Sequence, residues 1–374
     1  MSEIRVAVLG ARGWMGRIHT MAYQNIASFY GTSHGKATVA MLVTSDPEAA
    51  DDLRAQAPQA RIVPHWQQAI DDPDIDLIDI CLPDSLHYPV AKAAILAGKH
   101  VFCEKPLADT AAQARELADL AQARGVITRV GHAFPRNPVH DRAKELIEAG
   151  EIGEITLFKG WQHIDVFGDP DAPFMWRADG ALAATSIIGD TGSHVFSFMD
   201  YLVGPVKRLM ADAYIATPKR KREDGTWADV TNPDGCNLLC DFANGARGVV
   251  DFSRIATGQK FRQGYEIYGT KGSLIFDYDQ TNRLRFYSNQ APEGQRGFTA
   301  IDIGPENPNF RAFLPLANLS LGYNESKIIE AAEVIRSIRD NKPMWPTFET
   351  GHHICQIVDA CMQSSAERRW VDIG

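Results

Sequence analysis

Two short segments of the chain contain the residue types that acid–base chemistry on an alcohol requires. Lys105 follows a predicted buried strand at residues 100–103, so its ammonium group can enter a site at the end of that strand. Asp190 and His194 are four residues apart, and on a helix both side chains would lie on one face. A histidine can accept the proton of a hydroxyl while a carboxylate orients the ring and raises its pKa. We therefore predict that Lys105, Asp190 and His194 are catalytic and assist the loss of a hydride from an alcohol carbon.

Each of these residues also has an ordinary structural interpretation. Lys105 could be a surface lysine after a strand, Asp190 could be the N-cap of a helix, and His194 could be a core histidine among apolar neighbours. The functional interpretation is favoured because the same chain contains a glycine-rich turn that can hold a hydride acceptor.

That turn follows an apolar strand at residues 5–9. Gly10, Gly13 and Gly16 form a G-x-x-G-x-x-G spacing, a variant of the dinucleotide fingerprint in which glycines let the backbone approach a pyrophosphate. Glycines in such a turn also occur without a nucleotide. Their place after the first strand of an alternating array favours a dinucleotide site.

The residues after the second predicted strand leave the choice of cofactor open. Thr44 and Ser45 favour neither cofactor, and Asp46 could bind the ribose hydroxyls of NAD or simply start the next helix. Arg12 could instead contact the 2′-phosphate of NADP. We expect NAD, with NADP as the alternative.

The first 130 residues alternate strand and helix patterns, which predicts a doubly wound parallel sheet of the Rossmann type. The strands are expected at residues 5–9, 38–43, 75–80, 100–103 and 126–130, and the helices at 17–27, 47–57, 88–97 and 111–124.

After residue 132 the pattern changes to one helix at 139–149 and then a series of strands. These strands are expected at residues 154–162, 206–215, 237–242, 246–254, 265–268, 273–277 and 284–287, before helices at 323–339 and 351–369. Strands without intervening helices predict a large, mostly antiparallel, open-faced sheet. We therefore expect a dinucleotide-binding domain over residues 1–131 and a substrate-binding and oligomerisation α/β domain over 132–374. The polar segment 219–234 is expected to be an exposed loop.

Composition excludes several classes of protein. The net charge of −9 over 374 residues argues against nucleic-acid binding, which needs a basic face. No uncharged apolar run of about 18 residues occurs, so no membrane span is expected. The six cysteines form no CxxC pair and no zinc-site spacing, so we expect no metal site and free thiols in the cytoplasm. An open sheet face usually needs a cover, which predicts a homo-oligomer, a tetramer or a dimer.

Several motifs in a fixed order resemble those of a known family. They include Glu104-Lys105-Pro106 and Asp190-Thr191-Gly192-Ser193-His194, with further similarity at residues 16–19, 82–87, 97–107, 150–155 and 269–274. Over nearly its whole length the chain resembles the glucose–fructose oxidoreductase / inositol dehydrogenase family (Gfo/Idh/MocA). The resemblance implies a Rossmann domain, an α/β domain with an open sheet, NAD(P)-dependent oxidation of sugars or polyols, and frequent dimers or tetramers.

The resemblance also implies roles for individual residues. It makes His194 the acid/base, Asp190 its partner and a substrate contact, and Lys105 a contact to the nicotinamide ribose and the substrate. The residues predicted to bind the cofactor are Gly10, Arg12, Gly13, Trp14, Met15, Gly16, Thr44, Ser45, Asp46, Leu82, Pro83, His87, Glu104 and Lys105. The residues predicted to contact the substrate are Lys105, Gln162, His163, Arg177, Asp190 and His194. Arg177 lies in residues 174–177, a segment similar to the sugar and inositol dehydrogenases, and could bind substrate hydroxyls or form a structural ion pair.

Three positions depart from the family pattern. Asp84 stands where many members have Asn, and Ser197 stands where members often carry an Asp, so one polyol contact would be missing or replaced. Pro135 occupies the place of a common arginine, with Arg136 next to it.

Together these features predict an NAD(P)-dependent dehydrogenase that oxidises a secondary hydroxyl of a cyclic polyol or a monosaccharide to a ketone or lactone. Inositols such as scyllo- or myo-inositol, and pyranoses with similar equatorial hydroxyls, are the favoured substrates. Two alternatives are a sugar lyase or glycosidase with tightly bound NAD, and a non-catalytic NAD(P)-binding regulator.

Overall fold

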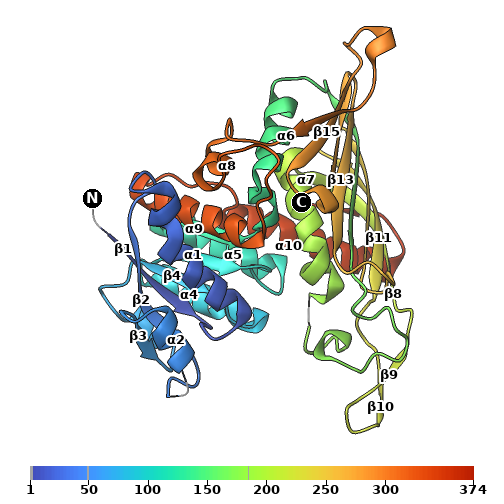
Figure 1. Cartoon of the computed structure of the whole chain (residues 1–374). Coiled ribbons are helices and arrows are strands. Elements are labelled where there is room, and N and C mark those ends of the chain that lie inside the picture. The colour runs from blue at the N-terminus through green and yellow to red at the C-terminus, as the bar shows by residue number, and fades with distance from the viewer. Residues whose placement is uncertain (1–2, 49, 184) are drawn as a thin grey trace. The chain divides into compact units, whose positions relative to one another are not determined.

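The computed structural model describes residues 3–48, 50–183 and 185–374, and this part of the chain divides into two compact units (Figure 1). The first unit runs to Arg136 and also includes Pro308–Leu314 and Leu321–His352. The second contains Asn137–Asn307, Pro315–Ser320 and His353–Gly374. The sequence predicts a single boundary between residues 131 and 132, whereas in the structure two later segments pack with the first unit.

The first unit is built on a parallel sheet, as predicted, with six strands where the sequence predicts five. Its strand order is β3-β2-β1-β4-β5-β6. The strands are β1 (Ile4–Leu9), β2 (Ala37–Val43), β3 (Arg61–Val63), β4 (Leu77–Ile80), β5 (His100–Glu104) and β6 (Thr128–Gly131). Strand β3 was not predicted, because it has only three residues and these are half-buried or exposed. The order 3-2-1-4-5-6 is that of a dinucleotide-binding fold.

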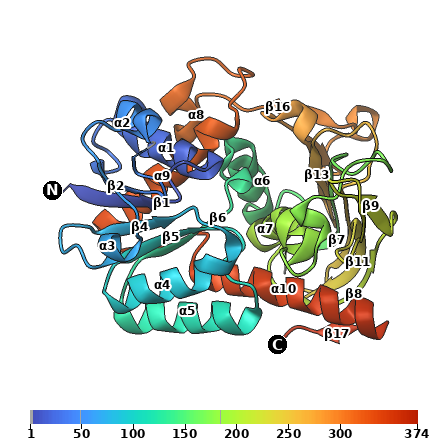
Figure 2. The same cartoon turned by 90° about the horizontal axis from the view of Figure 1, so that it is seen from below.

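Helices cover both faces of this sheet. They are α1 (Trp14–Tyr30), α2 (Asp51–Gln56), α3 (Gln67–Ile70), α4 (His87–Leu96), α5 (Ala111–Arg124), α8 (Pro308–Phe313) and α9 (Tyr323–Asp340), with short 3₁₀ turns at Asp84–Leu86 and Phe134–Arg136. Helices α4 and α5 lie side by side on one face, and α1 and α9 on the other (Figure 2). Ile328, Ala332 and Ile335 of α9 share one apolar core with Ala22 and Ile26 of α1. This packing brings a helix from late in the sequence into the first unit.

The second unit contains a nine-stranded sheet in the order β16-β15-β14-β13-β7-β12-β11-β8-β17. Its strands are β7 (Ile155–His163), β8 (Val206–Tyr214), β11 (Gly235–Phe242), β12 (Arg247–Ser253), β13 (Arg262–Gly269), β14 (Gly272–Asp277), β15 (Arg283–Ser288), β16 (Thr299–Asp302) and β17 (Val371–Asp372). Neighbouring strands are antiparallel except for the parallel pair β7 and β12. The prediction of a large, mostly antiparallel sheet is therefore confirmed.

Helix α6 (Pro138–Glu148), a π-helix at Ile188–Gly192 and helix α7 (Ser193–Leu202) belong to the second unit, and α10 (Phe348–Glu367) continues into it from the first. Helix α7 approaches the sheet closely because two contact positions are glycines. A Cβ atom on Gly160 would lie 2.6 Å from Val195, and one on Gly192 would lie 2.9 Å from Phe252. Glycine at these two positions therefore fixes the closeness of α7 to β7 and β12.

The expectation of an exposed polar segment at residues 219–234 is confirmed for most of its residues, but the segment is not an irregular loop. The segment forms a small hairpin of β9 (Lys219–Lys221) and β10 (Trp227–Asp229), and it contributes buried charges to the unit. Arg220 is 1% exposed and Asp234 is fully buried. The hairpin is thus mostly exposed, and its few buried polar side chains, such as Arg220, bond to a neighbouring loop.

Among the described residues, none of the helices combines the length and apolar character that a membrane crossing requires.

Candidate active site

The glycine-rich turn between β1 and α1 is a position where other residues do not fit. Gly10 has a φ of +75°, and a Cβ atom there would lie 2.3 Å from the carbonyl oxygen of Cys81. A Cβ atom on Gly16 would lie 2.4 Å from the carbonyl oxygen of Gly10, so the first turn of α1 packs directly on the turn. The two glycines therefore allow the close packing of strand, turn and helix that a dinucleotide fingerprint specifies.

The beginning of α1 has the properties that a pyrophosphate requires. Gly13 is its N-cap and provides no side chain to cap the helix, and the first turn carries no acidic residue. The amide groups of such a helix end bear a partial positive charge that favours an anion. Trp14 is 67% exposed and stacks on Tyr323 at 5.4 Å, and the Tyr323 hydroxyl contacts the Met15 sulfur at 3.7 Å. The N-terminal end of α1, with its free backbone amides and no acidic residue, therefore fits an NAD pyrophosphate.

Arg12 and Asp46, the two residues on which the choice between NAD and NADP depends, lie beside each other. Arg12 and Asp46 form an ion pair of 3.7 Å, and both side chains are exposed. Thr44 is buried, and its hydroxyl faces the backbone nitrogen of Asp46 at 3.5 Å, while Ser45 is exposed. A carboxylate beside Arg12 partly neutralises the charge that a 2′-phosphate would need. The arrangement favours ribose hydroxyls as the partner of Asp46.

His87 connects the ends of two neighbouring strands. Its ring nitrogens lie 2.6 Å from the carbonyl oxygen of Pro106 and 2.9 Å from that of Leu82. The His87 imidazole is buried. Pro83 follows Leu82 and is the N-cap of the 3₁₀ turn that begins at Asp84. The geometry makes His87 a link between the segments after β4 and β5.

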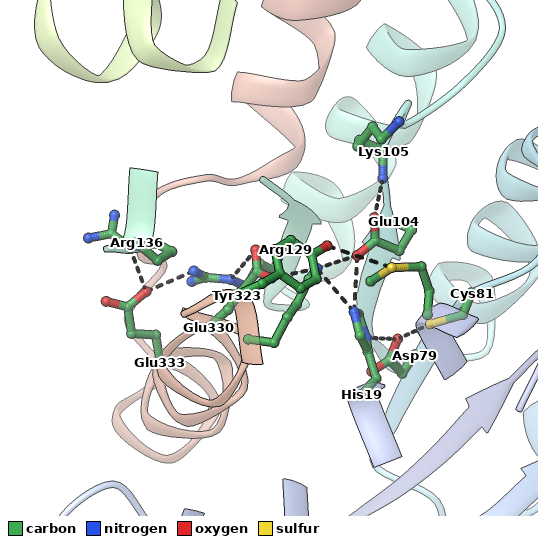
Figure 3. A network of polar contacts seen from close by, with 12 residues as sticks. His19, Asp79, Cys81, Glu104, Lys105, Arg129, Arg136, Tyr323, Glu330 and Glu333 are labelled. Atoms are coloured by element: carbon green, nitrogen blue, oxygen red, sulfur yellow. Dashed lines mark hydrogen bonds and ion pairs between the residues drawn. The ribbon is translucent and has the colours of Figure 1, made fainter. Parts of the chain in front are cut away.

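Glu104, which we predicted to contact the cofactor, lies inside the first unit with its carboxylate engaged by other residues (Figure 3). Its Oε1 lies 3.0 Å from Nε2 of His19 and accepts a hydrogen bond from Lys327, while its Oε2 faces the backbone N–H of Lys105 at 3.2 Å. The Lys105 side chain is half-buried and points away from this carboxylate (Figure 3).

The charges around Glu104 stabilise one another. Burial disfavours ionisation of Glu104, but the charge of Lys327 and the hydrogen bond from His19 outweigh it and hold the pKa of the carboxyl well below its usual value. Burial likewise opposes the charged form of Lys327, yet Glu104 and Glu330 raise its pKa well above the usual value. For His19, the charge of Asp79 overcomes burial and raises the pKa well above 6.5.

In the second unit, the predicted single helix around Asp190 and His194 is two helices of different type. Asp190 lies in the π-helix Ile188–Gly192, and His194 is the second residue of α7. His194 is half-buried between fully buried neighbours. Single π-turns within helices occur often at functional sites, because they re-aim side chains. The four-residue spacing is therefore present, but without the regular α-helix that we assumed.

Asp190 pairs with Arg177, another predicted substrate residue. Arg177 Nε lies 3.2 Å from Asp190 Oδ2, and its guanidinium lies over the Trp176 ring at 4.3 Å. Both members of the pair are about one-third exposed. The structure thus brings together Arg177 and Asp190 just before the N-terminus of α7.

Buried residues of the second unit hold the backbone of Arg177. Its carbonyl oxygen accepts hydrogen bonds from Arg254 at 2.9 Å and from Asn232 at 3.0 Å. Arg220 donates to the carbonyl oxygens of four nearby residues, Phe167, Asp169, Pro170 and Ala172. The loop that carries Arg177 is therefore fixed by three buried side chains.

Gln162 and His163 do not belong to the same site. Neighbouring residues of a strand point to opposite faces of the sheet. Gln162 is buried, pairs with Phe252 in the sheet and accepts a hydrogen bond from Gln263 at 2.8 Å. His163 bonds to Asp251 on the other face. Since α7 packs on the face of Phe252, His163 points away from the helix that carries His194.

At two of the three departures from the family pattern, the structure shows what the side chains do. The hydroxyl of Ser197 is buried and donates to the carbonyl oxygen of His194 at 2.7 Å, so it offers no group to a ligand. Arg136 is buried and its Nε lies 3.3 Å from Glu333, so this arginine belongs to the interior of the first unit.

Sequence reasoning missed the buried residues that α9 contributes to this region, in particular Lys327, Glu330 and Glu333. A signal was present, because Lys327 and Glu330 interrupt the apolar face of a predicted helix that also carries Ile328, Ala331 and Ala332. Charged residues on such a face are rarely buried without partners.

Comparisons with known proteins place the chain in a family. Residues 4–132 match the oxidoreductase family with an NAD-binding Rossmann fold, and residues 140–275 match the GFO/IDH/MocA C-terminal domain. Levoglucosan dehydrogenase of Pseudarthrobacter phenanthrenivorans is 32% identical over 388 aligned residues, covering 100% of this chain and 99% of that protein. A scyllo-inositol 2-dehydrogenase (NADP(+)) of Bacillus subtilis is 26% identical over 343 residues, covering 89% of this chain and 88% of that protein.

Solved structures agree with these matches. A levoglucosan dehydrogenase in complex with NADH and levoglucosan has a TM-score of 0.94 at 32% identity, with 100% of both chains covered. An NAD binding oxidoreductase from Klebsiella pneumoniae has a TM-score of 0.95 at 33% identity, again over 100% of both chains.

The chain belongs to the Gfo/Idh/MocA oxidoreductase family, which confirms the resemblance seen in the sequence. Its residues 4–132 form an NAD-binding Rossmann domain, and the protein is an NAD-dependent oxidoreductase.

Proposed function

We propose that the protein oxidises a secondary hydroxyl of a cyclic sugar to a ketone, with levoglucosan or a related pyranose as substrate. The observation that carries the proposal is the match of the entire chain to levoglucosan dehydrogenase at 32% identity. The pairing of Arg177 with Asp190, next to His194 on α7, supports it. A guanidinium and a carboxylate, both partly exposed, can bind neighbouring hydroxyls of a sugar ring.

The proposal gives each residue a chemical role. His194 accepts the proton of the hydroxyl as its carbon is oxidised, and Asp190 contacts the substrate and holds the position of the imidazole. Arg177 fixes the Asp190 carboxylate through the 3.2 Å hydrogen bond. Lys105 donates a hydrogen bond to the same hydroxyl oxygen and stabilises the negative charge that develops there. NAD, when bound, accepts the hydride, so one proton and one hydride leave the alcohol and a ketone remains.

The test is a screen of substrates with NAD, following the absorbance of the reduced nicotinamide. The panel contains levoglucosan, glucose, myo-inositol and scyllo-inositol. The anomeric carbon of levoglucosan lies in its anhydro bridge, so only a ketone can form from it, whereas glucose can also give a lactone. We expect the highest kcat/KM with levoglucosan or another pyranose and a ketone as product. A higher kcat/KM with either inositol would contradict the substrate class, and no reduction with any compound would contradict the function.

We also propose that NAD is preferred to NADP, because Asp46 lies beside Arg12 where the adenosine ribose would bind. The measurement is kcat/KM with each cofactor. Asp46→Ser should lower the preference for NAD, since it removes the carboxylate that repels a 2′-phosphate and leaves Arg12 free to bind it. A preference for NADP in the wild type would contradict this proposal.

Finally, we propose that the protein is a homo-oligomer, with a tetramer as the expected state. Leu239 pairs with Met210 on one side and with Val249 on the other, and these three apolar side chains are 37–48% exposed on one face of the nine-stranded sheet. Such a row on an open sheet is a suitable subunit contact. Light scattering should give a mass that is a multiple of 41.3 kDa, and Leu239→Asp should reduce it. A wild-type mass of 41.3 kDa at micromolar concentration would contradict the proposal.

A further inference from the structure

The interior of the first unit contains a continuous network of charged side chains below Lys105 (Figure 3). Four carboxylates and four basic groups take part: Asp79, Glu104, Glu330, Glu333, His19, Lys327, Arg129 and Arg136. All eight side chains are nearly inaccessible to solvent. With His19 protonated, as its raised pKa indicates, the four negative and four positive charges balance. Buried charges of this number are costly unless each one is paired.

Glu104 occupies the end of this network next to Lys105. Its Oε1 receives hydrogen bonds from His19 and Lys327, and its Oε2 is 3.2 Å from the backbone nitrogen of Lys105. The carboxylate is thus held from α1 and α9 on one side and contacts the main chain of Lys105 on the other.

The Glu104 carboxylate lies where a side chain on the neighbouring strand would otherwise be. Glu104 is paired with Gly131 on the neighbouring strand β6. A Cβ atom on residue 131 would lie 2.5 Å from Oε1 and 2.6 Å from the carboxyl carbon of Glu104. The absence of a side chain at Gly131 therefore creates the space that the Glu104 carboxylate fills.

We propose that Lys327 and His19 are positioning residues for Lys105: they fix the Glu104 carboxylate against Gly131, and Glu104 in turn holds the backbone of Lys105. The inference rests on the proposed function, in which Lys105 acts on the substrate hydroxyl. It extends that function to α9, whose lysine touches no reacting atom in this proposal. An error of about 1 Å in the position of a catalytic group can lower a rate about a hundredfold, so such support affects turnover.

Two other roles for the network predict different behaviour. His19, Glu104 and Glu330 place ligand atoms within 4.8 Å of one another, as a metal site would. Lys327, however, bonds to both carboxylates, with its Nζ 2.9 Å from Glu330, so an ammonium group already supplies the positive charge there. A purely structural network would stabilise the fold without affecting turnover.

The direct variant is Lys327→Met, which removes the cation but leaves Glu104 and Glu330 buried with reduced compensation, a change that also threatens the fold. The decisive variant is therefore Gly131→Ala, which displaces the Glu104 carboxylate by steric contact while every charge remains. Gly351→Ala is the matched control. Its Cβ atom would lie 2.7 Å from Leu107 and 2.8 Å from Val130, so it imposes a similar overlap on side chains of the same region outside the network.

Four quantities are measured for the wild type, both glycine variants and Lys327→Met. They are kcat and KM for the sugar, the Kd of NAD by calorimetry, and hydrogen exchange of the Lys105 backbone amide in the protein without cofactor. We expect Gly131→Ala to lower kcat by about tenfold to a hundredfold and to accelerate exchange at Lys105, with the Kd of NAD changed less than about threefold. Gly351→Ala should keep the wild-type kcat and the wild-type exchange at Lys105.

A folded Gly131→Ala variant with wild-type kcat and wild-type exchange at Lys105 would overturn the inference. Equal losses of kcat in Gly131→Ala and Gly351→Ala would overturn it as well, because the effect would then be general damage. If the wild type oxidises no sugar, the proposed function fails separately, and the exchange of the Lys105 amide still reports whether Glu104 holds this backbone.

Discussion

The glycine-rich turn gives a prediction whose size follows from the structure. Replacing Gly10 by alanine imposes two separate costs. The first is conformational, because φ at this position is +75°, which costs a residue with a Cβ atom about 1–2 kcal/mol. The second is steric, because the Cβ atom would lie 2.3 Å from the carbonyl oxygen of Cys81 and 2.9 Å from its carbonyl carbon.

Both atoms in this overlap belong to the main chain after β4, so no side chain can move aside. Overpacking of this kind costs about 1–3 kcal/mol. The two terms together predict that Gly10→Ala lowers the free energy of unfolding by about 2–5 kcal/mol. Relief of the overlap should also displace the turn that approaches the NAD pyrophosphate. We therefore expect the Kd for NAD to rise at least tenfold.

Variants of two other glycines separate the conformational cost from the steric cost. Gly98 has the same φ of +75° but nothing within 4 Å of its Cβ position, so Gly98→Ala should cost only about 1–2 kcal/mol and leave the Kd of NAD unchanged. Gly16 has no positive φ, yet its Cβ atom would lie 2.4 Å from Gly10, so Gly16→Ala reports the steric term and should weaken NAD binding.

The assay is urea unfolding of the three variants together with NAD titration by calorimetry. If Gly10→Ala unfolds at the same urea concentration as Gly98→Ala and binds NAD as tightly as the wild type, the close packing of the turn has no energetic consequence and the reasoning is refuted.

Two further predictions concern the buried charges of each unit. Arg254→Lys should raise KM for the sugar and lower the free energy of unfolding by about 1–3 kcal/mol. Lysine cannot keep both hydrogen bonds of the guanidinium, one of which holds the Arg177 carbonyl. Wild-type values of KM and of the free energy of unfolding would contradict this. His19→Gln should lower the free energy of unfolding most below pH 6.5, and the difference from the wild type should shrink as the pH rises through the elevated pKa of folded His19. The measurement is urea unfolding at several pH values. A difference that grows with pH would contradict the prediction.

The apolar pattern of the sequence predicted the strands that are buried along most of their length. The buried strands of the parallel sheet and the longer strands between residues 154 and 288 were predicted from their apolar patterns, whereas β16 and β17 were missed, β16 being mostly exposed and β17 having only two residues. Strand β3 was missed because its three residues are at most half-buried and depend on pairing with Met41, Leu42 and Val43 of β2.

The candidate site was predicted in its residue types but not in all of its contacts. The glycine turn, Lys105, Asp190 and His194 stand out by spacing, whereas the network around Glu104 depends on α9, which comes from more than 200 residues later in the chain. No local pattern specifies which sheet such a helix covers. The placement of Gln162 and His163 on opposite faces, in contrast, follows from the two-residue period of a strand and could have been predicted.

The central claim is that, in an NAD-dependent oxidation of a sugar, His194 accepts the proton of the hydroxyl and Lys105 stabilises the negative charge on its oxygen. It is tested most directly by kcat for Lys105→Ala, His194→Ala and the double variant, each with the Kd of NAD by calorimetry. The account predicts that each single change lowers kcat by about two to four powers of ten, that the double variant is little worse than either, and that NAD binding persists. A nearly normal kcat in Lys105→Ala or in His194→Ala would contradict the account.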